Sequence, residues 1–315
     1  MSGNAYPLGF AQIETVALVV NPLAGSGMAH RAAQHAVEAF VERDVDVVTL
    51  QGSSPDDARH MMSEVIADDR FDALVVVGGD GLVNLALQEQ AGSGMPLGLI
   101  PSGTGNDHAR EYSIPRHDAR AAARVIADGF WTHTDLARIT DAEGKQMWFG
   151  TIMCSGFDSL VTDRANTMSW PHGKNRYHLA LAREFVNFKA LPFRITLDDD
   201  VVLNDEITLA AFGNTRSYGG GMLICPAANH CDGVMDITVV GKASRLRAGR
   251  ALSSVFSGKH VEYDEVTTHR AKKAHVEYVG NGEDLSVYAD GEYMAKLPVT
   301  VEIVPGAGKF LVPRP

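Results

Sequence analysis

The sequence predicts an α/β domain built on a parallel sheet, followed by a second domain of antiparallel strands, expected to be a β-sandwich. Two observations support this division. Between residues 14 and 134, short apolar runs alternate with segments of helical periodicity, which is the pattern of βαβ units. From about residue 132 onward, apolar and polar residues alternate and turns separate the segments, which is typical of antiparallel sheets.

The elements of the first domain follow from short β-branched runs and from helix-start signals. In Ser54–Asp57 a capping serine precedes a proline at the first helical position, and two acids fall in the first turn, which indicates a helix start. The apolar runs are too short for membrane spans and read as buried strands. The expected strands are Val16–Val20, Val45–Leu50, Ala73–Val77 and Leu97–Ile100, and the other expected helices are Met28–Arg43 and Val83–Gln90.

The second domain is expected from strand-like segments with turns between them. One helical stretch, Tyr177–Lys189, interrupts these segments. We predict that the first domain covers residues 14–134 and the second 135–305, with residues 306–315 returning to the first. The expected strands are Arg194–Leu197, Glu206–Phe212, Met235–Val240, Leu285–Tyr288 and Val299–Val304.

The composition excludes several classes of protein. A net charge of −11 argues against a general nucleic-acid binder, which needs a basic surface. No run approaches the roughly 18 apolar residues of a membrane span, and we expect no signal peptide. The three cysteines, Cys154, Cys225 and Cys231, form no CxxC pair, which favours a reducing cytoplasm and gives no zinc site.

Three glycine-rich loops follow expected strands of the first domain: residues 21–27 (NPLAGSG), 78–81 (GGDG) and 101–107 (PSGTGND). Glycines let the backbone approach a ligand, and the helix that follows offers free N–H groups to an anion. A single loop of this kind is often only a tight turn. Loops that converge on the carboxyl edge of one parallel sheet instead predict a cleft for nucleotide phosphates. The candidate nucleotide-binding residues are Asn21, Gly78, Gly79, Asp80, Gly81, Leu82, Asn84, Ser102, Gly103, Thr104, Asn106 and Asp107.

These loops resemble the catalytic domain shared by diacylglycerol, sphingosine and ceramide kinases, and the likeness continues in family order to about residue 313. It is closest to the bacterial soluble diacylglycerol kinases. It implies ATP as phosphate donor, Mg²⁺ as cofactor and an active site between two domains. The matching segments of the second half are Ser155–Asp158, Asn214, Tyr218–Met222 (YGGGM), Cys225–Ala228, Asp232–Gly233 and Asp290–Glu292.

The resemblance assigns the proton acceptor to Glu292, because a kinase of this type needs a carboxylate within reach of the acceptor hydroxyl. A DGE tripeptide by itself is usually a solvated turn. Asp290 is expected either to orient Glu292 or to bind through the turn, and the sequence does not separate the two roles. Asp80 is the other charged group of the cleft, and holding Mg²⁺ through water, orienting the acceptor and acting as base all stay open for it.

The resemblance also places a magnesium ion in the second domain. Its ligands are expected to be the carboxylate of Asp232 and main-chain oxygens near Asn229 and Val234, since a hard cation takes oxygen ligands. The alternative for Asp232 is a plain hairpin turn. A separate Mg²⁺ is expected to travel with ATP, because phosphoryl transfer requires neutralisation of the developing charge.

Three positions depart from the family pattern. The loop usually reads GGDGT and the following helix usually carries Asn-Glu, whereas this chain has Leu82 and, after Asn84, Leu85. Leucine cannot offer phosphate a hydroxyl contact, whose loss costs about 0.5–1.5 kcal/mol. His108 stands where phenylalanine is common. These departures leave open an altered nucleotide preference or a catalytically weak, regulatory nucleotide-binding protein.

The acceptor is expected to be a lipid hydroxyl, with diacylglycerol the first choice and phosphatidylglycerol, sphingoid bases and ceramide as alternatives. The basic and aromatic segment 166–189 predicts either contact with anionic headgroups at the inner membrane surface or a helix packed on the sandwich. An NAD kinase shares the GGDG loop and the two-domain plan and is the alternative enzyme. A homodimer is also compatible with the resemblance.

Overall fold

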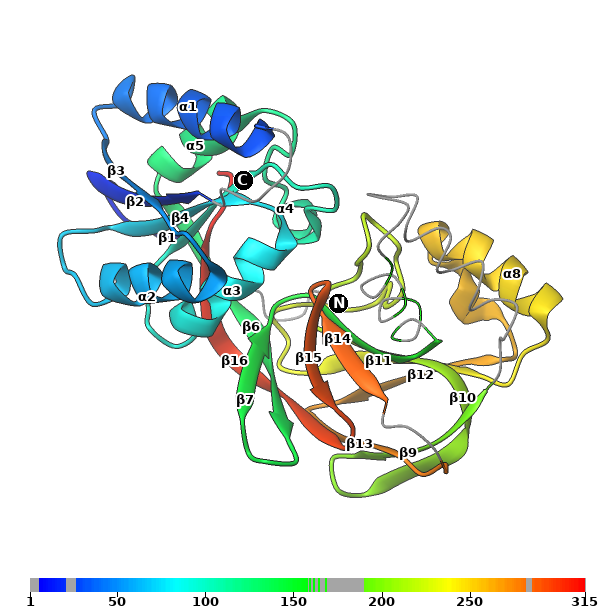
Figure 1. Ribbon diagram of the computed structural model, residues 1–315. Coiled ribbons are helices and arrows are strands. Elements are labelled where there is room, and N and C mark those ends of the chain that lie inside the picture. Colours follow the sequence, from blue (N-terminus) through cyan, green and yellow to red (C-terminus); the bar gives the residue numbers. More distant parts are fainter. Residues whose placement is uncertain are drawn as a thin grey trace.

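The computed structural model describes residues 6–20, 27–157, 159, 161, 164, 168, 190–281 and 285–314. They form an α/β domain and a β domain that lie side by side (Figure 1). This arrangement confirms the predicted fold class. The expected helix Tyr177–Lys189 lies outside the described residues, as does most of segment 166–189 around it. None of the described helices is long and apolar enough to cross a bilayer.

The first domain is a parallel sheet between two layers of helices. The sheet runs in the order β5–β4–β2–β3, and all of these neighbours are parallel. In Figure 1 helices α1 and α5 lie on one side of the strands and α2 and α3 on the other. Its elements are β2 (Thr15–Val20), α1 (Met28–Val41), β3 (Asp46–Gln51), α2 (Pro55–Ile66), β4 (Ala73–Gly78), α3 (Asp80–Gln90), β5 (Leu97–Pro101), α4 (Asp107–Glu111) and α5 (Ala119–Ala127).

Capping side chains fix where two of these helices begin. Ser54 accepts a hydrogen bond from the Asp57 N–H at 3.1 Å, and Pro55 occupies the first helical position of α2, as expected. Asp118 accepts from the Ala121 N–H at 3.0 Å at the start of α5. Such caps satisfy N–H groups that have no partner inside the helix.

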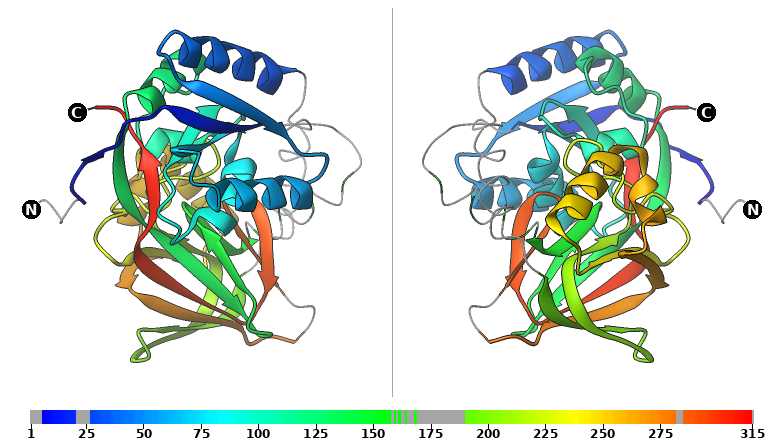
Figure 2. Two further views of the ribbon diagram at one scale, coloured as in Figure 1. Left: turned by 90° about the vertical axis from the view of Figure 1, so that its left-hand side faces the viewer. Right: turned by 90° about the vertical axis from the view of Figure 1, so that its right-hand side faces the viewer.

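The second domain is built from antiparallel strands around its own apolar core. The principal path is β15–β14–β8–β10–β9–β13–β16, and β11 joins β10 to β12. Figure 2 shows these strands wrapping around one another below the first domain. Its elements are β8 (Ile152–Gly156), β9 (Leu191–Leu197), β10 (Val201–Gly213), β11 (Met235–Gly241), α8 (Arg245–Ser254), η1 (Val255–Ser257), η2 (Lys259–Glu262), β12 (Val266–Ala271), β13 (Lys273–Tyr278), β14 (Ser286–Ala289) and β15 (Glu292–Lys296).

Two long strands connect the domains. Strand β6 (Phe130–Asp141) pairs antiparallel with β16 (Val299–Leu311) through a register shift between Val304 and Gly308. Before the shift β16 contributes to the second core. After it, Phe310 pairs in parallel with Leu97 of β5 and is buried in the first core. Two short strands, β1 (Gly9–Phe10) and β7 (Gln146–Phe149), extend this ribbon by pairing with β6.

Leu82 belongs to the core of the first domain. Helix α3 begins at Asp80, three residues before the expected start, so Leu82 lies in its first turn. The side chain is buried and covers Gly78, where an added Cβ would lie 2.9 Å from Leu82 Cδ2. The side chain is therefore packed against the sheet.

We expect Leu82→Thr to lower the free energy of unfolding by about 2–4 kcal/mol, because it removes buried apolar volume and buries a hydroxyl. Urea denaturation followed by circular dichroism measures this loss. Val41→Thr is the matched control, since Val41 is 64% exposed on α1 and its replacement should change stability by less than about 0.5 kcal/mol. Equal stabilities of the two variants would contradict the packing of Leu82.

Candidate active site

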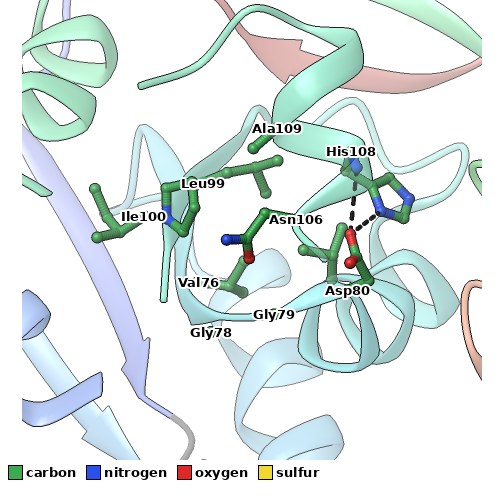
Figure 3. A pocket seen from close by; sticks show the side chains of 11 residues that line it. Val76, Gly78, Gly79, Asp80, Leu99, Ile100, Asn106, His108 and Ala109 are labelled. Atoms are coloured by element: carbon green, nitrogen blue, oxygen red, sulfur yellow. Dashed lines mark hydrogen bonds and ion pairs between the residues drawn. The ribbon is translucent and has the colours of Figure 1, made fainter. Parts of the chain in front are cut away.

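The carboxyl ends of β4 and β5 bring two of the glycine-rich loops together. Ser102 donates its N–H to the Gly78 carbonyl at 2.9 Å, and a Cβ on Gly103 would collide with the Gly79 backbone. Only glycine allows the two loops to approach this closely. A small pocket opens where they meet (Figure 3). It is lined by Val76, Gly78, Gly79, Asp80, Val83, Leu99, Ile100, Pro101, Asn106, His108 and Ala109.

Asn106 shapes the second loop. It has a left-handed backbone with φ of 52°, a conformation that asparagine tolerates better than most residues. Its amide bonds to both backbone groups of Gly103, accepting from the N–H at 3.0 Å and donating to the carbonyl at 2.9 Å. Thr104 is exposed on the same loop, whereas the buried hydroxyl of Ser102 has no partner among the described residues.

Asp80, the first residue of α3, is held by the start of α4. Its Oδ1 accepts from the N–H groups of Asp107 at 2.8 Å and His108 at 3.2 Å, and the His108 ring nitrogen Nδ1 lies 3.2 Å away. Burial opposes ionisation, but the hydrogen bonds and charge of His108 keep the pKa of Asp80 below its usual range. Figure 3 shows this pairing beside the pocket.

Asp107 connects the first domain to the second. Its Oδ2 accepts from the Gly220 N–H at 2.8 Å, so the YGGGM loop contacts the PSGTGND loop directly. Its other oxygen pairs with Arg110. Burial raises the pKa of Asp107, and the nearby Asp80 adds to the effect.

Asp290 approaches the interface from the second domain, and its backbone has a positive φ of 53°. Its side chain is fully buried and accepts from the N–H groups of Gly150 at 2.9 Å and Thr151 at 2.8 Å. It also accepts from the Thr151 hydroxyl and, at 3.0 Å, from the Asn84 amide. Asn84, expected at the nucleotide, thus points into the second domain. Four donors leave Asp290 suited to hold the interface rather than to accept a proton.

Glu292 is the carboxylate that lies over the GGDG loop. It begins β15 and stays exposed to solvent, and a Cβ on Gly81 would collide with its Oε1. Partial burial raises the pKa of Glu292 above its ordinary value, and the negative charge of Asp290 raises it further. A carboxylate with a raised pKa, close to a phosphate-type loop, has the properties of a general base.

The expected magnesium position has a different arrangement. The Asp232 carboxylate pairs with Arg270, and Val234 donates its N–H to Asp232 at 3.3 Å. The Asn229 side-chain oxygen accepts from the Cys231 N–H at 3.3 Å. No cluster of three acidic, histidine or cysteine side chains suited to a metal occurs in the described parts of the chain. Arg270 is thus the cation that faces Asp232 in this arrangement, and the magnesium site with main-chain oxygens near Asn229 and Val234 stays a prediction.

Several residues of the site were not expected from the sequence. The sequence marks His108 only as a departure from the family pattern and gives no reason to expect the backbone groups of Gly150, Thr151 and Gly220 as carboxylate partners. No local signal identifies them, because a backbone N–H is the same in every residue except proline. The candidate Asn21 and the motif residue Asp158 lie outside the described residues.

Comparison with known proteins assigns the chain to a family. Residues 15–139 match the diacylglycerol kinase catalytic domain, and residues 151–312 match the YegS C-terminal NAD kinase beta sandwich-like domain. A diacylglycerol kinase of Mycobacterium tuberculosis (strain ATCC 25618 / H37Rv) is 49% identical over 304 residues, covering 96% of each chain. The diacylglycerol kinase of Bacillus subtilis (strain 168) is 25% identical, covering 89% of this chain and 90% of that one.

The structure leads to the same group of proteins. A crystal structure of a candidate diacylglycerol kinase from Bacillus anthracis str. Sterne superposes with a TM-score of 0.78 at 25% identity, covering 96% of this chain and 98% of that one. Kinases of this group use ATP. With both domains matched in order, the chain belongs to the bacterial diacylglycerol kinase-like lipid kinase family and is a lipid kinase.

Proposed function

We propose that this protein transfers the γ-phosphoryl group of ATP to the free hydroxyl of diacylglycerol, with Glu292 as the general base. The observation that carries the proposal is the position of the Glu292 carboxylate over Gly81, beside the loop expected to hold phosphates. The choice of diacylglycerol rests on the names of the relatives, including one that is 49% identical.

The nucleotide is proposed to lie across the carboxyl edge of the first sheet, with its phosphates over residues 78–84 and 102–106. The side chains of Leu82 and Asn84 are engaged elsewhere. Because the Leu82 N–H donates to the Gly79 carbonyl at 3.1 Å, phosphate contacts are proposed to come from the backbone N–H groups that precede Leu82 at the start of α3, a position that favours anions. The first core also holds Leu85. Leu82 and Leu85, which depart from the family pattern, thus give no support to the alternative of a catalytically weak regulatory protein.

Mg²⁺ is proposed to travel with ATP and to neutralise charge that develops on the phosphates. On the carboxyl edge of the first sheet, Asp80 is the side chain that fits a magnesium ion. Within the described part of the chain, the hydrogen bonds of Asp80 all go to its Oδ1, while an added Cβ on Gly105 would lie 2.8 Å from its Oδ2. A carboxylate kept ionised, with one oxygen near the loop, is a suitable hard ligand.

In the proposed step, Glu292 accepts the hydroxyl proton as the hydroxyl oxygen attacks the γ-phosphorus. A new oxygen–phosphorus bond forms, the bond to the β-phosphate oxygen breaks, and ADP leaves with the electron pair of that bond. Gly81 allows the carboxylate close to the reacting phosphate because it has no side chain. Asp290 holds the turn that carries Glu292 through its four donors.

A direct test supplies labelled ATP with diacylglycerol in detergent micelles or with NAD in solution. We expect labelled phosphatidic acid from the first reaction and no labelled product from the second. Parallel micelles of phosphatidylglycerol, a sphingoid base and ceramide identify the preferred hydroxyl lipid. Turnover of NAD alone would overturn the proposal and favour an NAD kinase.

Glu292→Gln should lower turnover about 10²–10⁴-fold, because it removes the proton acceptor, and should leave ATP affinity nearly unchanged. Steady-state kinetics and calorimetric ATP titration separate the two effects. Since Glu292 must be ionised and its pKa lies above the ordinary 4.5, wild-type activity should fall with acid already above that pH. Glu206→Gln, on an exposed carboxylate of β10, is the matched control. A loss of only a few-fold would make Asp80 the leading base.

We also propose that the enzyme contacts the inner membrane surface peripherally through residues 242–259, the basic segment. It contains five basic residues and no acid, although the whole chain is acidic. Phe256 within it is 61% exposed. Basic residues contribute about 1 kcal/mol each to binding an anionic bilayer, and an exposed aromatic ring adds apolar contact.

Hydrogen bonds join the basic segment and the next residue, His260, to the chain just after the YGGGM loop. Leu223 donates its N–H to the Val255 carbonyl at 3.1 Å, and the His260 ring donates to the Ile224 carbonyl at 3.0 Å. Leu223 directly follows the loop whose Gly220 contacts Asp107. A membrane under the basic segment would therefore lie near the contact between the two domains.

The double variant Arg250→Glu/Phe256→Ser should bind anionic phosphatidylglycerol vesicles at least several-fold more weakly than wild type, because it reverses one charge and removes the exposed ring. Flotation of vesicles with bound protein measures this. Phe10→Ser is the matched control, since Phe10 is 66% exposed at the start of the chain. Equal binding by all three proteins would reject the basic segment as the contact surface, without affecting the activity measured in micelles.

A further inference from the structure

The three glycine-rich loops, residues 21–27, 78–81 and 101–107, contain no lysine or arginine. The described residues that line the pocket between two of these loops include none either. Asp80 and Asp107, whose N–H bonds to Asp80 at 2.8 Å, add negative charge at the same place. Phosphate groups beside two carboxylates need positive charge to bind there. That charge must come from Mg²⁺ or from a side chain outside the loops.

Arg110 of α4 reaches the loop of residues 101–107. Its Nη2 donates to the Gly105 carbonyl at 3.3 Å, and its Nη1 donates to the Asp107 carboxylate. Asp80 is close to the same point, because an added Cβ on Gly105 would lie 2.8 Å from Asp80 Oδ2 and 3.2 Å from Asp107 Oδ2. Arg110 therefore brings a positive charge to a loop that has no basic residue of its own.

The second domain also packs against the Arg110 guanidinium. A Cβ on Gly221 would lie 3.2 Å from both Cζ and Nε of Arg110, and Gly221 has a φ of 110°, which favours glycine. The neighbouring Gly220 donates its N–H to Asp107. Arg110 is thus held between the PSGTGND loop and the YGGGM loop, and a side chain that is already held loses less entropy when it binds a ligand.

Arg110 keeps donors for a ligand. A guanidinium carries five N–H donors, and the contacts to Gly105 and Asp107 engage two of them within the described part of the chain. The side chain is 25% exposed, so the group is not sealed inside the interface. Its planar fork matches the geometry of phosphate oxygens, whereas a lysine ammonium acts as a point charge.

We propose that Arg110 is a phosphate-binding residue, whose guanidinium donates hydrogen bonds to the terminal phosphates of ATP at the PSGTGND loop. Asp107 orients the guanidinium, and the Gly221 backbone supports it. Its positive charge offsets the repulsion between the phosphates and the carboxylates of Asp80 and Asp107. This inference rests on the proposed position of the nucleotide over residues 102–106.

Calorimetric titration with ATP and with AMP, each in the presence of Mg²⁺, tests the inference. For Arg110→Met we expect the affinity for ATP to fall about tenfold or more, because hydrogen bonds to charged groups are lost. The affinity for AMP should stay near the wild-type value, since AMP lacks the β- and γ-phosphates. Arg110→Lys should lose less, because it keeps the charge without the fork. Arg124→Met, on an exposed arginine of α5, is the matched control and should bind both nucleotides like wild type.

An arginine with a purely structural role would weaken the binding of ATP and AMP by the same factor. That result, or an unchanged affinity of Arg110→Met for ATP, would overturn the inference. Failure of the proposed function gives a different result, because wild type would then bind ATP and still leave diacylglycerol unphosphorylated.

A second measurement needs no variant. Phenylglyoxal modifies accessible arginines, and mass mapping of peptides shows which of them have reacted. We expect ATP to slow the modification of Arg110, AMP to have no such effect, and Arg124 to react at the same rate in both. Equal modification of Arg110 with and without ATP would count against the inference even if the variants at this position did not fold.

Discussion

The pairing of β6 with β16 is the constraint on which both domains depend. Residues of β16 before the register shift are buried in the second core, and Phe310 after it is buried in the first. A register shift lets one strand turn different faces inward along its length. Because the ribbon is shared, the carboxyl edge of the parallel sheet always faces the end of the antiparallel domain. The loops and Glu292 therefore meet where the two domains touch.

Buried carboxylates then fix how the domains face each other. Asp107 of the first domain accepts from Gly220 of the second, and Asp290 of the second accepts from Asn84 of the first. A buried carboxylate without donors is costly, so each of these contacts is directional and hard to replace by another arrangement. His108 lies between Asp80 and Asp290 at the same place. The interface is polar because it must hold groups in register, and the apolar cores supply most of the stability.

The sequence predicts what is local and misses what is distant. Buried strands and glycine loops follow from short runs of residues, and Ser54 marks a helix start by itself. The contact between Asn84 and Asp290 joins residues 206 apart, and no local pattern encodes it. Leu82 shows a second limit. Its place in a loop motif suggested a missing phosphate contact, but the first turn of α3 directs its side chain into the core. The motif gave the position of the backbone and not the direction of the side chain.

The DGE turn shows how two neighbouring acids acquire different roles. Asp290 and Gly291 both have positive φ, of 53° and 84°, so the chain reverses within two residues. Asp290 is turned inward, where four donors bond to its carboxylate, and Glu292 is turned outward over Gly81, where the described residues offer it no comparable set of donors. An acid that is already satisfied gains little by accepting a proton, whereas one that is partly desolvated beside a negative charge gains much. The turn therefore separates a fixed anchor from the proposed proton acceptor, and Asp290 raises the pKa of Glu292 while holding it in place.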